Sequence, residues 1–220
     1  LEITQDLYQM KDTNLVIGAE MFERDDQAII NEYFKDLISQ RSFEREAKLW
    51  DNYQKAYKPL VEFAKDSGLK LVATNIPRRY ADYVASHGLS LDSLAEKKQQ
   101  WFAPQPIEVN MELASYQEMM DMGGGHGMER MVHAQAVKDA TMAHFINQYL
   151  EAEETLFHLN GTFHSKYNEG IYWYLNKYNP DLKVTTLNSV EQKHVTELQQ
   201  ANQKLGDFIL TIPDNMTKPY

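Results

Sequence analysis

The 220-residue sequence contains no cysteine. Disulfide bonds, thiolate catalysis and iron-sulfur ligation are therefore excluded within these residues. Apolar runs of about 20 residues, which a membrane-spanning helix needs, are also missing, and the first residues lack the pattern of a signal peptide. Because the sequence starts at Leu1 and not at a methionine, we expect a fragment or a processed form, in which an upstream lipid-bearing cysteine would not be visible.

An excess of positive charge is absent as well, since the formal net charge is -10 at neutral pH. Nucleic-acid backbones and anionic membranes attract basic surfaces, so neither is expected as a partner. The content of 43% hydrophobic and 25% charged residues is typical of a globular protein. A chain of this length can form one sizeable core with a smaller attached subdomain.

Three apolar, strand-like runs each end at a polar residue. Residues 15–19 lead to Glu20, residues 69–74 lead to Asn75, and residues 155–160 lead to a Gly-Thr-Phe-His turn that ends at His164. Helical patterns follow each run, which predicts an α/β fold with a mostly parallel sheet flanked by helices. Because the carboxyl ends of parallel strands meet at one edge, we expect Glu20, Asn75 and His164 to share a crevice.

The composition changes between residues 88 and 125, where prolines, methionines and three consecutive glycines replace the strand-like runs. We expect residues 1–87 and 151–220 to form the α/β domain and residues 88–150 to form a helical insertion or lid subdomain. The patterns also predict a long helix over residues 44–65 and two later strands over residues 183–187 and 207–212. A helix over residues 190–204 is expected between these two strands.

A helix is predicted over residues 126–150, and it has two distinct faces. Gln135 and Asp139 lie on an otherwise apolar face, where they form either a structural hydrogen-bonded pair or part of a binding site. His126, His133 and His144 lie on the opposite face, and the nearest two are about 10 Å apart along the helix, too far to share one metal ion. We interpret them as exposed or interface histidines. Alternatively, a flat cofactor or a partner subunit covers this face of the helix.

His164 follows a glycine that permits a tight turn and leaves room for a ligand. A structural role for this histidine is the alternative, but Glu20 in a comparable position can orient an imidazole or join it on a divalent metal. Arg78 lies in the first turn of a helix after Asn75, where the helix N-terminus favours anions. The 13 tyrosines are mostly expected in the core, yet an exposed one beside an apolar cleft is a candidate haem ligand.

Taken in order, several motifs resemble those of the ChaN-like haem-binding, iron-regulated lipoproteins, and the resemblance covers nearly the whole chain. These motifs are Ala19-Glu20-Met21-Phe22 with Asp26-Gln27, Trp50 with Tyr53 and Tyr57, Asn75-Ile76-Pro77-Arg78, Gln135 and Asp139 with Met142-Ala143, and Gly161-Thr162-Phe163-His164 with Gly170.

The resemblance implies an α/β domain with a small helical domain, exported to the cell envelope, lipid-anchored and linked to bacterial iron acquisition. It also implies a homodimer that holds haem on a tyrosine, which we do not assign to a position here. The related erythromycin esterases and Tiki/TraB proteins use glutamate and Gly-x-x-His motifs, which Glu20 and His164 match. Their first strand, with a Gly-Glu-x-His motif, has no counterpart before Ile3. If an upstream part was removed, half of that site and one central strand are missing.

Two functions from different classes follow. The first is a cell-envelope haem-binding protein linked to iron acquisition, for which Gln27, Asn75, Arg78, Gln135 and Asp139 are the candidate ligand-binding residues. The second is a metal-assisted hydrolase in which Glu20 and His164 bind a divalent metal or activate water. In the hydrolase, Arg78 would anchor an anionic substrate and Asn75 would orient it. A scaffold with a vestigial site is a third possibility.

Overall fold

The computed structural model describes residues 1–89, 91, 99–123 and 127–217. The strands are β1 (Leu15–Glu23), β2 (Lys70–Asn75), β3 (Thr155–Leu159), β4 (Leu187–Gln192) and β5 (Phe208–Pro213). The helices are α1 (Glu2–Lys11), α2 (Gln27–Phe34), α3 (Gln40–Glu46), α4 (Tyr53–Ala56), α5 (Lys58–Asp66), α6 (Arg78–His87), α8 (Ala114–Met122), α9 (Met128–Tyr149) and α10 (Ile171–Tyr178).

The three strands predicted from the apolar runs form one parallel sheet in the order β2-β1-β3. The central strand β1 is buried along almost its whole length, as expected for a parallel strand covered on both faces. It continues past the predicted end to Glu23, and its register with β2 shifts between Ala19 and Glu23. Glu20 therefore lies at an irregularity of the ladder, the kind of position where a strand can redirect a side chain.

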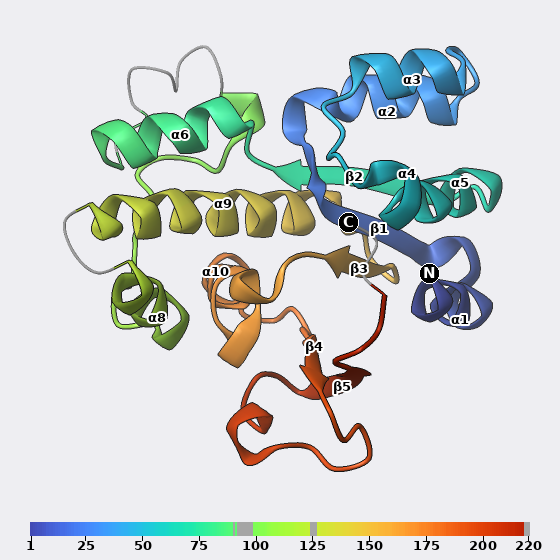
Figure 1. The fold of residues 1–220 in the computed structure, drawn as a ribbon. Helices are drawn as coiled ribbons and strands as arrows, with labels where there is room; N and C mark the ends of the chain where they lie inside the picture. Colours follow the sequence, from blue (N-terminus) through green and yellow to red (C-terminus); the bar gives the residue numbers. More distant parts are fainter. Residues whose placement is uncertain (90, 92–98, 124–126, 218–220) are drawn as a thin grey trace.

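Helices cover both faces of this sheet, so the α/β prediction is confirmed (Figure 1). On one face, apolar side chains of α2, α3, α4 and α5 pack against alternate residues of β1 and β2, including Leu15, Ile17 and Leu71. On the other face, α6, α9 and α10 form a second core around Val84, Met142 and Tyr174. The alternation of side chains along the strands thus divides the hydrophobic residues between two layers.

The predicted helix over residues 126–150 is observed as α9 (Met128–Tyr149), whereas His126 lies outside the described residues. α9 contacts β2 and lies between α6 and α10 (Figure 1). It carries residues of the expected insertion into the layer that covers the sheet. The division into an α/β domain and an insertion over residues 88–150 stays a prediction. Within the described ranges, α9 included, no helix combines the length and apolarity needed to cross a membrane.

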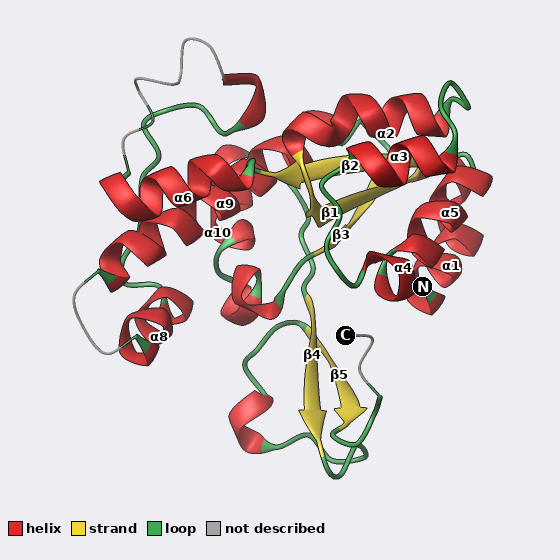
Figure 2. Cartoon of the chain, turned by 45° about the horizontal axis from the view of Figure 1, so that its top comes forward, coloured by secondary structure: helices red, strands yellow, loops and turns green. Residues whose placement is uncertain are grey.

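Two helix predictions are wrong, and the strand expected over residues 183–187 is observed later in the chain, as β4. The helix expected over residues 44–65 is interrupted between α3 and α4, where the backbone N–H of Lys48 donates to the Asp26 carboxylate. The helix expected over residues 190–204 is replaced by an exposed connection with a short 3-10 helix at Gln200–Asn202. β4 and β5 form their own parallel pair, apart from the main sheet (Figure 2). In the first segment a tertiary contact overrides the helical pattern. The second segment is almost entirely exposed, so little packing is available to stabilise a helix there.

Gly18 of β1 gives a test of this packing, because a Cβ there would lie 2.8 Å from Cδ2 of His158 and 3.1 Å from Leu156. The His158 ring is hydrogen-bonded at both nitrogens and cannot move freely. We expect Gly18→Ala to lower the free energy of unfolding by about 1–3 kcal/mol in urea titrations. Gly161→Ala is the control, because its nearest contact is at 3.6 Å. An equal loss in both variants would contradict this explanation.

Candidate functional site

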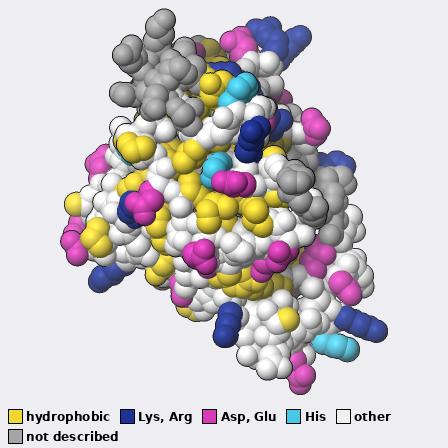
Figure 3. Space-filling model, turned by 90° about the vertical axis from the view of Figure 1, so that its left-hand side faces the viewer, with side chains coloured by type: hydrophobic (Ala, Val, Ile, Leu, Met, Phe, Trp, Pro, Cys, Tyr) yellow, Lys and Arg dark blue, Asp and Glu magenta, His cyan; other side chains and the backbone are white. Residues whose placement is uncertain are grey.

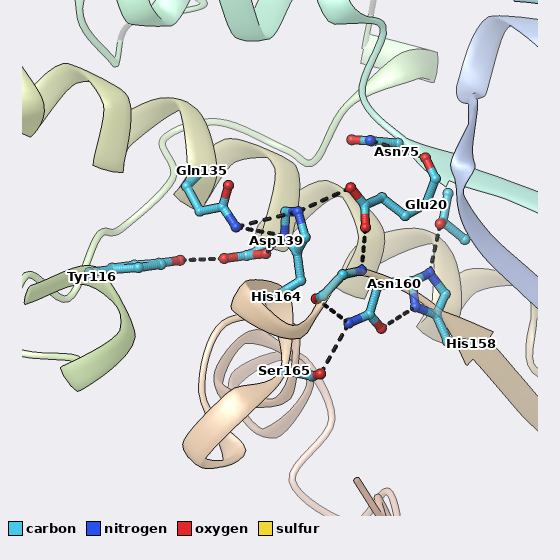
Figure 4. A network of polar contacts seen from close by, with 11 residues as sticks. Glu20, Asn75, Tyr116, Gln135, Asp139, His158, Asn160, His164 and Ser165 are labelled. Carbon is cyan, nitrogen blue, oxygen red and sulfur yellow. Dashed lines mark hydrogen bonds and ion pairs between the residues drawn. The ribbon is translucent and has the colours of Figure 1, made fainter. Parts of the chain in front are cut away.

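The polar residues at the carboxyl end of the sheet do meet, as predicted. Glu20 of β1 points toward the turn after β3, where one carboxylate oxygen accepts a hydrogen bond from the backbone N–H of Gly161 at 2.7 Å. Its other oxygen lies 3.2 Å from Nε2 of His164. Both side chains are largely buried. The strand end and the Gly-x-x-His turn are therefore joined through one carboxylate (Figure 4).

The second nitrogen of the His164 ring contacts α9. Nδ1 of His164 forms a short hydrogen bond with Asp139, whose other oxygen accepts a bond from the Tyr116 hydroxyl at 2.7 Å. The amide nitrogen of Gln135, one helical turn before Asp139, lies 2.9 Å from the same ring nitrogen. Gln135 and Asp139 thus reach His164 from the apolar face of α9, as the helical spacing indicated. The contacts run without a gap from α8 to β1 (Figure 4).

The charges of this network follow from its burial and its contacts. Burial lowers the pKa of His164, but the charges and hydrogen bonds of Asp139 and Glu20 outweigh burial and raise it to about 9. Burial raises the pKa of Glu20, yet contacts with His164 and Gly161 bring it down to about 2. Burial raises the pKa of Asp139, against the attraction of His164. In ionised form the three groups are one imidazolium between two carboxylates.

These protonation states limit the chemistry. A general base for hydrolysis needs a pKa near the working pH and a free lone pair. His164 is charged at neutral pH with both nitrogens engaged, and Glu20 is a very weak base. No group of three or more His, Asp and Glu side chains in the described ranges is arranged to hold a metal ion. The geometry therefore favours a structural network over the catalytic or metal-binding roles expected for Glu20 and His164.

A second hydrogen-bonded branch links the three strands. Asn75 at the end of β2 donates to the Glu20 carbonyl at 3.1 Å. Burial lowers the pKa of His158 to about 4, so this ring is neutral. Because Asn160 uses its amide N–H groups on Gly161 and Ser165, its oxygen accepts from Nδ1 of His158. Nε2 of His158 is then the acceptor for the Thr74 hydroxyl at 2.8 Å.

Gly170 allows α10 to start close to this network. Its φ angle of 57° lies in the left-handed region, and a Cβ there would fall 2.5 Å from the His164 carbonyl oxygen and 3.1 Å from the Asp139 carboxylate. No L side chain fits this position without movement of the backbone. Close packing therefore explains why a glycine is present at position 170, which is part of the family motif.

Two predicted site residues lie outside the network. Arg78 begins α6 but is exposed, and it has no hydrogen bond or ion pair with any described residue. Gln27 begins α2, where its amide accepts from Ala73 N–H at 2.8 Å and donates to the Leu71 carbonyl at 2.9 Å. Gln27 therefore satisfies backbone hydrogen-bonding groups on the outer edge of β2. Neither residue forms a described contact with Glu20 or His164, and their ligand-binding roles stay predictions.

Sequence reasoning missed Tyr116 and His158 in the network, and Arg24 outside it. Tyr116 is fully buried and ends the chain of contacts at Asp139, but no spacing rule links it to α9. Arg24 is buried beyond β1, where its guanidinium lies 4.1 Å from the Phe145 ring centroid and donates to the Tyr149 hydroxyl at 3.0 Å. The Asn-Gly pair at 160 and 161 was a visible turn signal. Tyr116 and Arg24 carried no such signal.

Two cavities lie near the network. The larger, about 910 Å³, extends along β3 and is bounded by α10 and the segment 181–187. The smaller, about 540 Å³, lies between the loop 104–108, α10 and His144 of α9. Neither is lined by Glu20 or His164. Both volumes are in the range of small-molecule and cofactor sites.

Comparison with known proteins comes to the same fold and family as the motifs. The family described as "Haem-binding uptake, Tiki superfamily, ChaN" matches residues 1–175. The solved structure "Cofacial heme binding to ChaN of Campylobacter jejuni" aligns with a TM-score of 0.68 over 94% of this chain and 77% of that chain, at 15% sequence identity. Comparison with curated proteins gives no match. The fold of this chain is therefore that of the Campylobacter protein.

The contrast between two histidines is directly measurable. We expect His164 to remain protonated up to about pH 9 and His158 to remain neutral down to about pH 4. Nuclear magnetic resonance of histidine-labelled protein between pH 4 and 10 measures both values, and His164→Gln and His158→Gln assign the signals. Two rings that titrate near 6.5 would contradict the electrostatic description.

The same values predict how stability depends on pH. The folded pKa of His164 lies above the ordinary 6.5, so its contribution is complete below about pH 6.5 and is lost as pH rises through 9. The folded pKa of His158 lies below 6.5, so the free energy of unfolding falls between about pH 6.5 and 4. Urea titrations should show a maximum near pH 6.5 and a flatter alkaline side in His164→Gln. A maximum above pH 8 would contradict this.

Asp139 is expected to stabilise the fold more than its hydroxyl partner does. Asp139→Asn removes the buried charge that faces His164 and should cost about 3–5 kcal/mol of unfolding free energy. Tyr116→Phe removes one hydrogen bond to a charged group and should cost about 1.5–3 kcal/mol. Urea unfolding at pH 7 measures both. A loss below about 1 kcal/mol in Asp139→Asn would show that the network is not central to stability.

Proposed function

Because the chain belongs to the haem-binding uptake family of the Tiki superfamily, ChaN, we propose that it binds haem. The observation that carries the proposal is the family match, which runs from α1 through the network and into α10. The shared fold with the Campylobacter protein, whose structure concerns cofacial haem binding, supports it.

The residues present fit such a group. Haem is flat and largely apolar, and it needs an apolar cleft together with at least one atom that can bind iron. The 540 Å³ cavity has Pro104, Pro106 and Ile107 on one side and Tyr174 and Tyr178 on another, and an imidazole lines it. Apolar walls and a nitrogen donor are thus available in one place.

The surface on the α8 side is also suited to an apolar partner. Hydrophobic side chains are exposed across this face, with acidic side chains between them (Figure 3). Met122 of α8 and Met131 of α9 are among the exposed large hydrophobic residues, and Met119 and Met120 are partly buried against a small core that includes Tyr116. Methionine-rich surfaces adapt to varied apolar ligands.

The tyrosines offer fewer candidates than their number suggests. A phenolate ligand is favoured by a lowered pKa. Burial and, for Tyr167, above all a hydrogen bond to Glu118 have the opposite effect and raise the pKa of six tyrosines, so a lowered pKa marks none of them: Tyr33, Tyr53, Tyr116, Tyr167, Tyr174 and Tyr178.

The wider role that we propose is iron acquisition at the cell envelope, with export and a lipid anchor upstream of these residues. A homodimer is part of the same proposal. The family resemblance supports these points. The hydrolase alternative is not favoured, since the Glu20 and His164 side chains are engaged with each other and with their neighbours.

Titration with hemin tests the haem proposal. We expect saturable binding to the purified chain with a shifted Soret band, and at least tenfold weaker binding of iron-free protoporphyrin, because the iron–protein bond is then missing. Absorption spectra measure both, and light scattering with and without hemin gives the oligomeric state. Non-saturable binding of hemin, equal to that of the iron-free ring, would contradict the proposal.

A further inference from the structure

His144 of α9 faces the 540 Å³ cavity and is half-buried. It lies in the chain between the Asp139 network and the end of α9, but on the opposite side of the helix from Asp139, as the spacing indicated. The cavity wall consists of the proline-containing loop 104–108 and two tyrosines of α10. This imidazole is therefore reachable from a cleft with apolar and aromatic walls.

The ring nitrogens of His144 are not engaged. Among the described residues, His144 forms no hydrogen bond and no ion pair, and its ring contact is with Phe145 at 5.0 Å between centroids. His158 and His164 are instead bonded at both nitrogens, and Nδ1 of His87 contacts the Tyr83 carbonyl. Neither nitrogen of His144 is among the buried side-chain atoms of the described ranges that lack a partner, so the ring is open to the cavity. It is therefore available to a ligand that enters the cavity.

The surroundings keep this ring in the form that binds metals. Burial lowers the pKa of His144, and the positive charge of nearby Arg24 lowers it further. Arg24 is itself buried, and among the described residues no carboxylate forms an ion pair with it. Its charge is therefore not cancelled locally. Neutral imidazole has a free lone pair for a metal, whereas imidazolium has none.

One free imidazole cannot build a protein metal site, because such sites need three or more ligands and no such group is present in the described ranges. It can complete a haem site, because the porphyrin supplies four nitrogens and the protein adds an axial ligand. Lys177 and Glu108 also line the cavity, where they form an ion pair with each other at its partly exposed side.

We propose that His144 is an axial ligand of the iron of a haem bound in the cavity between α9, α10 and the loop 104–108. This inference rests on the proposed haem binding and adds the site and the ligand to it. It differs from the tyrosine ligation that the family resemblance implies. The walls contribute apolar contact, while Arg24 and burial keep the ligand neutral.

Hemin titration of the purified wild-type chain, His144→Ala and His194→Ala tests the ligand. His194 is the matched control, because its imidazole is exposed and far along the chain from the cavity. We expect at least a tenfold higher Kd in His144→Ala, together with loss of the absorption and paramagnetic resonance spectrum of histidine-ligated ferric haem. His194→Ala should match wild type. Circular dichroism checks that each variant is folded.

Rescue separates ligation from packing. In His144→Gly, millimolar imidazole should restore the wild-type spectrum, because free imidazole can occupy the vacated space and bind the iron. If wild type binds hemin and His144→Ala has the same spectrum and a Kd within twofold, the ligand assignment is overturned while haem binding stands. Failure of imidazole rescue in a folded variant also overturns it. If wild type does not bind hemin saturably, both proposals fail.

Discussion

A buried imidazole between two carboxyl groups connects the main parts of the fold. His164 connects the end of β1, the turn after β3 and the middle of α9, and Tyr116 extends the connection to α8. Removing charges from water is unfavourable unless each charge finds a partner. Each partner here comes from a different part of the chain, so the correct arrangement of these elements satisfies the charges and other arrangements leave them unpaired. We therefore expect the network to favour this arrangement of the elements over others.

Three histidines in one small region occupy three electrostatic environments. His164 is charged because carboxylates surround it, and His158 is neutral because it is buried among neutral hydrogen-bond partners. His144 is neutral because of burial and a nearby cation, and no described protein group occupies its nitrogens. The residue that sequence motifs pick out most clearly, His164, is therefore the one least free to bind a ligand. The motif marks the structural centre, while the proposed binding residue lies on the opposite side of α9.

Much of the sheet and the meeting of Glu20 with His164 could be predicted, because parallel strands bring their carboxyl ends together and helical spacing fixed the face of Gln135 and Asp139. The positions of the Arg78 and Gln27 side chains could not be predicted, because the direction of a side chain in a first helical turn depends on how that helix packs. The helix expected over residues 190–204 had a suitable pattern, but it has no apolar surface to bury against in this structure. Residues without a spacing rule, such as Tyr116, become visible only in three dimensions.

The two outer strands of the main sheet differ in whether side chains bond to the backbone groups of their free edges. Side chains of Gln27 and Arg24 satisfy the Leu71 and Ala73 backbone groups of β2. The other edge strand, β3, pairs within the described ranges with β1 alone, and its residues 155–159 include no lysine, no proline and no acidic residue. Such an edge is a template for strand addition. Whatever covers the five backbone residues of β3 therefore also prevents this chain from pairing with another copy of itself through that strand.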